Sequence, residues 1–217
     1  MAGAVNAIVG SGSLVTFPTL LAVGFTPVVA NVSNTVGLVF GSISGAWGYR
    51  RELRGQLRRV LTLGAGSAVG ALAGGILLLA LPGSVFDAVV PVLILLAVAL
   101  MAFKPAPKAG ARRDHIVVGT GGTFLTGIYG GYFGAAQGVI LLAVLRLVFE
   151  DDLQRLNAVK NVLAGIANGV AAVLFVAAGS IAGGFIGSAY GRRLPEVWLR
   201  RIVIVGGTIV AVILIVD

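Results

Sequence analysis

The sequence contains no cysteine, one histidine and only 8 acidic residues among its 217 positions. Without cysteine, the chain forms no disulfide and offers no thiolate ligand to a metal. Charged residues make up 11% of the chain, whereas a soluble domain has about 25%. This scarcity of charge argues against a soluble domain.

The groupings required for catalysis and nucleotide binding are also missing. No nucleophile, base and orienting group occur together in the polar segments, and neither a P-loop nor a dinucleotide-binding fingerprint is present. The single histidine, His115, has no neighbouring metal ligands or catalytic partners in the sequence. We therefore expect neither an enzyme nor a bound metal or cofactor.

Apolar residues dominate the chain, at 58% of positions and a mean hydropathy of +1.02. A helix that crosses a bilayer needs about 20 apolar residues, and most of the apolar runs reach that length. The net charge of +8 is concentrated in short segments between these runs. That pattern is typical of topology signals, not of a nucleic-acid-binding face. We predict an all-α, multi-pass membrane helix bundle that contacts the lipid bilayer and no nucleic acid.

Two apolar runs, 1–24 and 116–149, are interrupted by glycine-rich breaks, GSGS in the first and GGYFG with QG in the second. A helix break leaves backbone N–H groups unpaired, and in a membrane such groups must line a cavity. The N-terminus of the following half-helix attracts anions. We expect broken or re-entrant helices in both runs, with half-helices starting at about Leu14 and Val139. The residues assigned to a binding site at the breaks are Gly12, Ser13, Gly134, Gln137 and Gly138.

The chain contains an internal repeat with a shift of 126 residues, which aligns Asn31 with Asn157 and Asn34 with Lys160. Later the shift falls from 126 to 109, so the second half has a deficit of 17 residues near position 179. The predicted organisation is one membrane domain with two repeat halves and a basic linker, at 1–103, 116–217 and 104–115. In the second half we expect separate apolar segments at 153–178, 180–191 and 197–216.

Lys160 lies eight residues beyond Asp152, about 12 Å along a helix. A charge at a bilayer centre costs about 2.5–3.5 kcal/mol, and such residues usually face a bundle interior or a substrate route. Asp87 on another helix is the alternative partner. We assign Lys160 to an anion site, with neighbouring amide and hydroxyl groups. These are Asn31, Asn34, Thr35, Asn157 and Asn161, for which hydrogen bonding between helices is an equally good reading.

Three segments resemble the sulfite exporter TauE/SafE family. They are AGAVNAIVGSGSLVTFPTLLAVGFTPVVANVSNTVG at 2–37, YGGYFGAAQGVILLAVL at 129–145 and LNAVKNVLAGIANGVAAVLFV at 156–176. The resemblance implies a polytopic carrier of the bacterial inner membrane for small anions, typically sulfite or organic sulfonates, with export as the expected direction. The chain departs from the family in the GSGS and GAAQG segments and in the shortened second half.

Several alternatives remain open at this stage. The chain starts at Met1 almost inside an apolar span, and we expect further residues to precede it. This start and the departures from the family motivate the alternative of a transport-inactive accessory subunit. A channel-like anion pore is another alternative, and a homo-oligomer is compatible with either. Eight full crossings compete with six crossings plus two re-entrant hairpins. The positive-inside rule favours six, because the basic segments then share one side.

Overall fold

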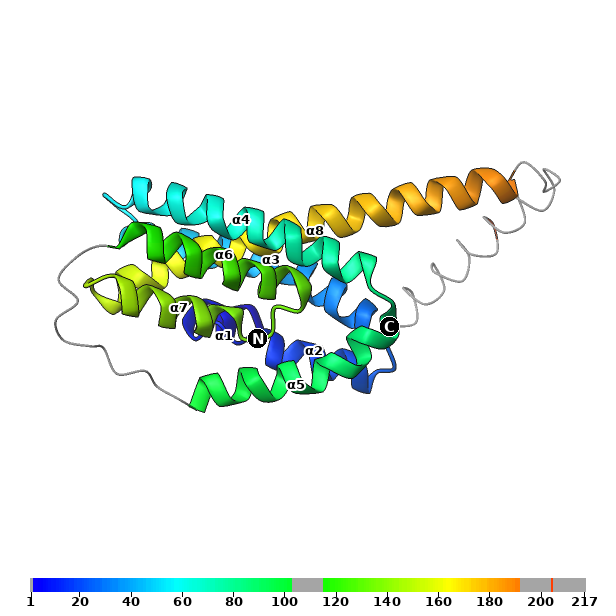
Figure 1. Cartoon of the computed structure of the whole chain (residues 1–217), viewed down its shortest axis with the longest axis horizontal. Helices are drawn as coiled ribbons and strands as arrows, with labels where there is room; N and C mark the ends of the chain where they lie inside the picture. Colours follow the sequence, from blue (N-terminus) through cyan, green and yellow to red (C-terminus); the bar gives the residue numbers. More distant parts are fainter. Residues whose placement is uncertain (1, 103–114, 192–203, 205–217) are drawn as a thin grey trace. The chain divides into compact units, whose positions relative to one another are not determined.

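The computed structural model describes residues 2–102, 115–191 and 204, whose regular elements are helices with no strand among them (Figure 1). The chain comprises two compact units, residues 1–175 and 176–217. The helices are α1 (Ala2–Ile8), α2 (Ser13–Ala22), α3 (Pro27–Gly48), α4 (Leu57–Ala80), α5 (Gly83–Ala102), α6 (Ile116–Tyr132), α7 (Gln137–Val148) and α8 (Leu153–Gly191). The expected all-α class is confirmed.

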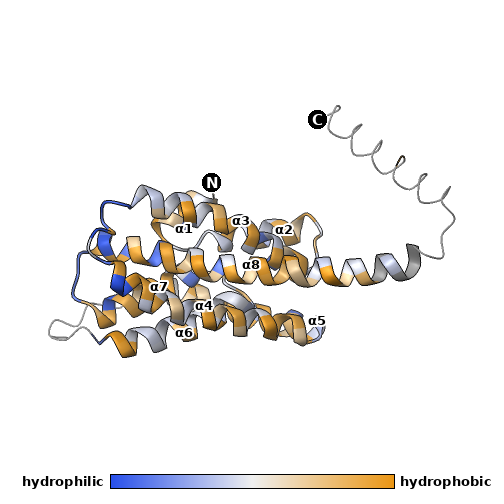
Figure 2. Ribbon diagram, turned by 90° about the horizontal axis from the view of Figure 1, so that it is seen from above, coloured by the Kyte–Doolittle hydropathy of each residue, from blue (hydrophilic) through white to orange (hydrophobic). Residues whose placement is uncertain are grey.

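Three described helices are long and apolar enough to cross a membrane, within Pro27–Gly48, Leu57–Ala80 and Leu153–Phe185. Pro27 supplies the fixed φ that suits a first helical position, and Thr26 before it is extended. In the first unit, hydrophilic residues gather where α3 ends and α8 begins (Figure 2). Two of these helices contact the interrupted segments, since α3 packs against α1 and α2, and α4 packs against α6.

Both interrupted segments fold back as helical hairpins. Gly12, at the start of α2, lies against the Ala2 carbonyl at the start of α1. Ile116 and Phe149, at the two ends of the α6–α7 segment, line one cavity. The two ends of the α6–α7 segment therefore lie together, as in a re-entrant hairpin. The predicted helix breaks in both apolar runs are confirmed.

The hairpin tips require backbone conformations that favour glycine. Gly10 has φ +84° and Gly134 has φ +75°. Ala136, which the repeat aligns with Gly10, has φ +54°, and a non-glycine residue in that left-handed region costs about 1–2 kcal/mol. Helices α2 and α7 begin at Ser13 and Gln137, one and two residues before the expected starts.

The helix pair α4–α6 packs at backbone distance in the first unit (Figure 1, cyan and green). A Cβ added to Gly127 would lie 2.5 Å from the Ser67 carbonyl oxygen. A Cβ on Gly66 would lie 2.8 Å from the Thr120 carbonyl oxygen. These glycines hold α6 against a membrane-spanning helix, which anchors the second hairpin.

Asp151 ties the start of α8 to α4. Its carboxylate accepts hydrogen bonds from Arg59 at 2.7 Å and from Arg155 at 2.9 Å. Burial by itself raises the pKa of Asp151, but the hydrogen bonds from Arg59 and the Asp152 amide, with the charges of Arg155 and Arg59, outweigh it and lower the pKa below the ordinary 3.8. The ionised carboxylate therefore helps to position the helix that carries Lys160.

The expected separation of 153–178 from 180–191 is wrong, because α8 is one continuous helix over both segments. The first half has a turn between α3 and α4 at residues 49–56. By contrast, no proline or charged residue interrupts 161–191. The helix therefore continues. The segment expected at 197–216 lies outside the described residues, apart from Ile204.

Candidate functional site

The two hairpin tips meet in the first unit, at glycine residues. The Gly138 amide donates to the Gly10 carbonyl at 3.1 Å. A Cβ on Gly10 would lie 2.5 Å from Gly138 backbone atoms, so the backbones themselves are in contact. Ser13 Oγ donates to the Gly134 carbonyl at 3.3 Å and accepts from the Ala136 amide at 3.1 Å. The structure thus brings the break residues of the two distant segments together.

Lys160 reaches from α8 to the end of α1 and is only 1% exposed. Its Nζ donates to the carbonyl oxygens of Asn6 at 3.0 Å and Ala7 at 3.1 Å. The last carbonyls of a helix lack intrahelical donors and carry a partial negative charge, which stabilises a nearby cation. Lys160 therefore caps the C-terminus of the first half-helix, a role that the sequence analysis did not include.

Two amides of α8 join this cap. Asn157 Nδ2 and Asn161 Nδ2 both donate to the Ala7 carbonyl, at 3.3 and 3.1 Å. The suggested pairing of Lys160 with Asp87 is wrong, since Asp87 is exposed and no ion pair joins the two side chains. Carbonyl dipoles, not a carboxylate, surround the ammonium group within the described chain.

The first half makes the reciprocal contact. Asn31 Nδ2 of α3 donates to the Tyr132 carbonyl at the end of α6, at 3.0 Å. Thr35 Oγ1 donates within α3 to the Asn31 carbonyl at 2.9 Å, and Thr16 Oγ1 donates to Asn34 Oδ1. Each long polar helix therefore caps the half-helix of the opposite hairpin. The interhelical role considered for the amides is observed for Asn31, Asn34, Asn157 and Asn161.

The two half-helix N-termini differ in their availability to a ligand. In α7, the Ala136 and Gly138 amides already donate to Ser13 Oγ and to the Gly10 carbonyl. At the start of α2, the amides of residues 11–13 have no hydrogen-bond acceptor within the described part of the chain. Of these two N-termini, the one at the start of α2 keeps buried backbone donors without an acceptor among the described residues.

The hairpin tips and the polar side chains of α3 and α8 that cap them form a polar cluster. Several buried polar atoms in this cluster have no partner among the described residues. They include Asn157 Oδ1 and Asn161 Oδ1 on α8, Asn31 Oδ1 on α3 and Gln137 Nε2 on α7. Buried polar groups are nearly always hydrogen-bonded in native proteins. These atoms therefore mark positions for water or for polar groups of a ligand.

Two cavities adjoin the cluster at different levels along α3. One, of about 510 Å³, lies among α1, α2 and α3 and includes Thr16 and Asn34 in its lining. The other, of about 520 Å³, lies between α3 and α8 and includes Asn161 and Arg50. The first reaches residues 33–38 of α3 and the second residues 42–50. Sequence reasoning missed both cavities, because their linings are mostly apolar.

Comparison with curated proteins gives several relatives. A probable membrane transporter protein, ORF9, from Sinorhizobium is 34% identical over 144 residues, which cover 64% of this chain and 54% of that relative. A probable membrane transporter protein of Haemophilus influenzae is 26% identical over 208 residues, covering 89% of this chain and 81% of the relative. The probable membrane transporter protein YfcA of Escherichia coli K12 is 27% identical over 209 residues, covering 89% of this chain and 77% of the relative.

This chain spans about half the length of the Sinorhizobium relative. No solved structure matches it. The family model described as Sulfite exporter TauE/SafE matches residues 1–214. That match covers nearly the whole chain and agrees with the all-helical fold and its apolar spans, so the chain belongs to the sulfite exporter TauE/SafE family of multi-pass membrane transporters.

Proposed function

We propose that this membrane transporter is a secondary carrier that exports a small sulfur-containing anion, such as sulfite or an organosulfonate. The observation that carries the proposal is the side chain of Lys160, which is buried in the bundle without a carboxylate partner in the described chain. The family membership supports membrane transport of a small molecule.

The charge of Lys160 calls for a counter-ion. A lysine ammonium has three N–H donors, and two of them go to the Asn6 and Ala7 carbonyls. Carbonyl dipoles reduce the desolvation cost, which is several kcal/mol for a buried ion, but leave the net charge unchanged. A bound anion neutralises that charge through the third donor.

Neutral groups around Lys160 complete a polar site. The free amides at the start of α2 are further donors for an anion. The unpaired oxygens of Asn157 and Asn161 need donors instead. Water that accompanies the anion, or a protonated oxygen of the substrate, meets that need. The site suits a small oxyanion that keeps part of its hydration.

The arrangement of cavities supports alternating access. One cavity reaches residues 33–38 of α3 and includes Asn34, and the other reaches residues 42–50 and includes Asn161. Each hairpin is held by the polar helix of the other half, through Asn31 and through Lys160. We propose that the halves 1–103 and 116–217 are inverted repeats, and that a shift of the hairpins opens the site to each side in turn.

The membrane potential supplies a driving force. No described carboxylate makes a hydrogen bond or ion pair with the cluster, so the proposal includes no proton relay there. An anion that leaves a negative cytoplasm gains about 2.3 kcal/mol per charge per 100 mV. Electrogenic export of the anion follows from these two points.

Flux through proteoliposomes tests the proposal. We expect saturable sulfite or sulfonate efflux that accelerates with a potential directed to expel anions, and no acceleration of a neutral solute. Protein-free vesicles are the control. Absence of flux, together with no thermal stabilisation by any anion of the panel, indicates an accessory subunit. Flux that rises linearly without saturation indicates a pore.

A further inference from the structure

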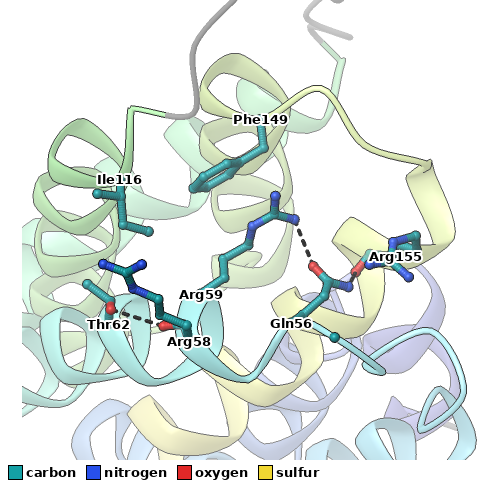
Figure 3. A pocket seen from close by; sticks show the side chains of 8 residues that line it. Gln56, Arg58, Arg59, Thr62, Ile116, Phe149 and Arg155 are labelled. Atoms are coloured by element: carbon teal, nitrogen blue, oxygen red, sulfur yellow. Dashed lines mark hydrogen bonds between the residues drawn. The ribbon is translucent and has the colours of Figure 1, made fainter.

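A third cavity, of about 480 Å³, lies where α7 ends and α4, α6 and α8 begin (Figure 3). Its volume is within the roughly 300–1,000 Å³ of ligand sites. The lining residues used below are Gln56, Arg58, Arg59, Ile116, Phe149 and Arg155. None of them belongs to the polar cluster at the hairpin tips, so the cavity is a separate site.

Three arginines give this cavity a net positive charge. Asp151 compensates part of it, since it pairs with Arg59 and Arg155. Asp152 is exposed and its carboxylate caps the Gln154 amide at 2.9 Å. The Arg58 guanidinium has no partner among the described residues. Asp151 thus pairs with two of the three guanidinium groups, and the third, on Arg58, is left for an anion.

Two helix N-termini reinforce this charge. Helix α4 follows Gln56 and α6 follows His115, and neither residue caps its helix through the side chain. Gln56 instead donates to the carbonyls of Glu52 at 2.8 Å and Arg155 at 3.3 Å, and accepts from Arg59. The first amides of both helices thus lack a side-chain acceptor, and uncapped N-termini attract anions.

The cavity also has an apolar wall. Figure 3 shows Arg58 beside Ile116 and Arg59 beside Phe149, where the guanidinium carbon of Arg59 lies 4.3 Å from the ring centroid. Next to the cavity, Leu61 of α4 and Val117 of α6 are 63% and 80% exposed. In a membrane protein such side chains face lipid chains. The ligand that fits is an anion with an apolar tail.

We propose that this cavity binds the phosphate headgroup of an anionic phospholipid, with its acyl chains along α4 and α6. Basic pockets between membrane helices are suited to anionic headgroups. The guanidinium fork of Arg58 pairs with phosphate oxygens in a bidentate manner. Because the cavity joins α4 to the start of α8, the bound lipid stabilises the contact that Asp151 makes between these helices.

Thermal unfolding of the purified full-length protein in uncharged detergent tests the proposal. Phosphatidylglycerol should raise the unfolding temperature, whereas phosphatidylcholine and inorganic phosphate should leave it unchanged. Arg58→Gln should weaken the phosphatidylglycerol effect about fivefold in half-saturating concentration, from the loss of one arginine near a lipid headgroup. Arg51→Gln is the matched control, since it removes an equal exposed charge outside the cavity.

Native mass spectrometry provides a second readout, in which the parent and Arg51→Gln should retain phosphatidylglycerol and Arg58→Gln should lose it. Equal loss in both variants overturns the proposal in favour of non-specific surface attraction. Stabilisation by inorganic phosphate equal to that by phosphatidylglycerol shows that the site takes a free anion, and overturns the assignment to lipid.

Discussion

Removal of the charge of Lys160 should weaken anion binding far more than removal of a neutral amide. The comparison uses Lys160→Met, Lys160→Gln and Asn34→Ala. Methionine has nearly the length of lysine but donates no hydrogen bond, while glutamine keeps an N–H donor without the charge. Asn34 occupies the position that the repeat aligns with Lys160.

The magnitude follows from the burial of Lys160, which is 1% exposed. An anion 4 Å from its Nζ gains about 4 kcal/mol at an effective dielectric constant of about 20. At 1.4 kcal/mol per tenfold, loss of the charge weakens binding on the order of 100- to 1,000-fold. A neutral hydrogen bond contributes about 0.5–1.5 kcal/mol, so Asn34→Ala should cost about 2- to 10-fold.

Titration calorimetry with sulfite on purified protein measures these affinities, after gel filtration and thermal unfolding have established that each variant is folded. Asn31→Ala is a second comparison, because it removes a neutral amide of the site together with one cap of a half-helix, the bond to the Tyr132 carbonyl, without altering charge. If folded Lys160→Gln or Lys160→Met binds sulfite within threefold of the parent, the charge argument is refuted and Lys160 serves only as a cap of α1.

Further predictions concern the backbone, the ion-pair network and the topology. Gly10→Ala should prevent folding or lower the free energy of unfolding by more than about 3 kcal/mol, because its Cβ would lie 2.5 Å from the Gly138 backbone. Gly24→Ala, at φ +99° with no other atom within 4 Å of its Cβ, should lower that free energy by only about 1–2 kcal/mol in equilibrium unfolding. Asp151 has a lowered pKa, so its stabilisation is present above the unfolded pKa and is lost as pH falls through the folded pKa. Unfolding temperatures measured from pH 6 to pH 3 should fall more steeply for the parent than for Asp151→Asn, and parallel curves would contradict this. Single cysteines at His115 and Glu150, in a chain without native cysteine, should react with an impermeant thiol reagent from the same side of the membrane; labelling from opposite sides would exclude the α6–α7 hairpin.

Local chemistry explains which parts of this fold were predictable. The glycine-rich breaks were located to within one or two residues, because positive φ angles near +80° are available to glycine at little cost. The continuity of α8 was not predicted. Two apolar segments with a glycine between them are compatible either with a turn or with an uninterrupted helix, and only the missing turn residues favour the helix.

The residues of the candidate site could be predicted from the sequence, but their hydrogen-bond partners could not. A buried lysine and asparagines in apolar helices had to point inward, and Lys160, Asn157 and Asn161 do so. Their acceptors lie about 150 residues away, at the end of α1. No local pattern specifies a partner at that separation, so both Asp87 and an anion remained candidates until the hairpin was located.

The sequence by itself therefore determined the membrane environment, the family and the two helix breaks, because these depend on composition and on local backbone energetics. The tertiary structure decided which ends of the broken helices have hydrogen-bond partners. It places the α7 amides on the opposite hairpin and the ammonium of Lys160 on the α1 carbonyls, while the amides at the start of α2 stay free. The physical reason is that backbone groups left unpaired by a helix break form hydrogen bonds with the donors and acceptors that the packing of the two hairpins brings within reach.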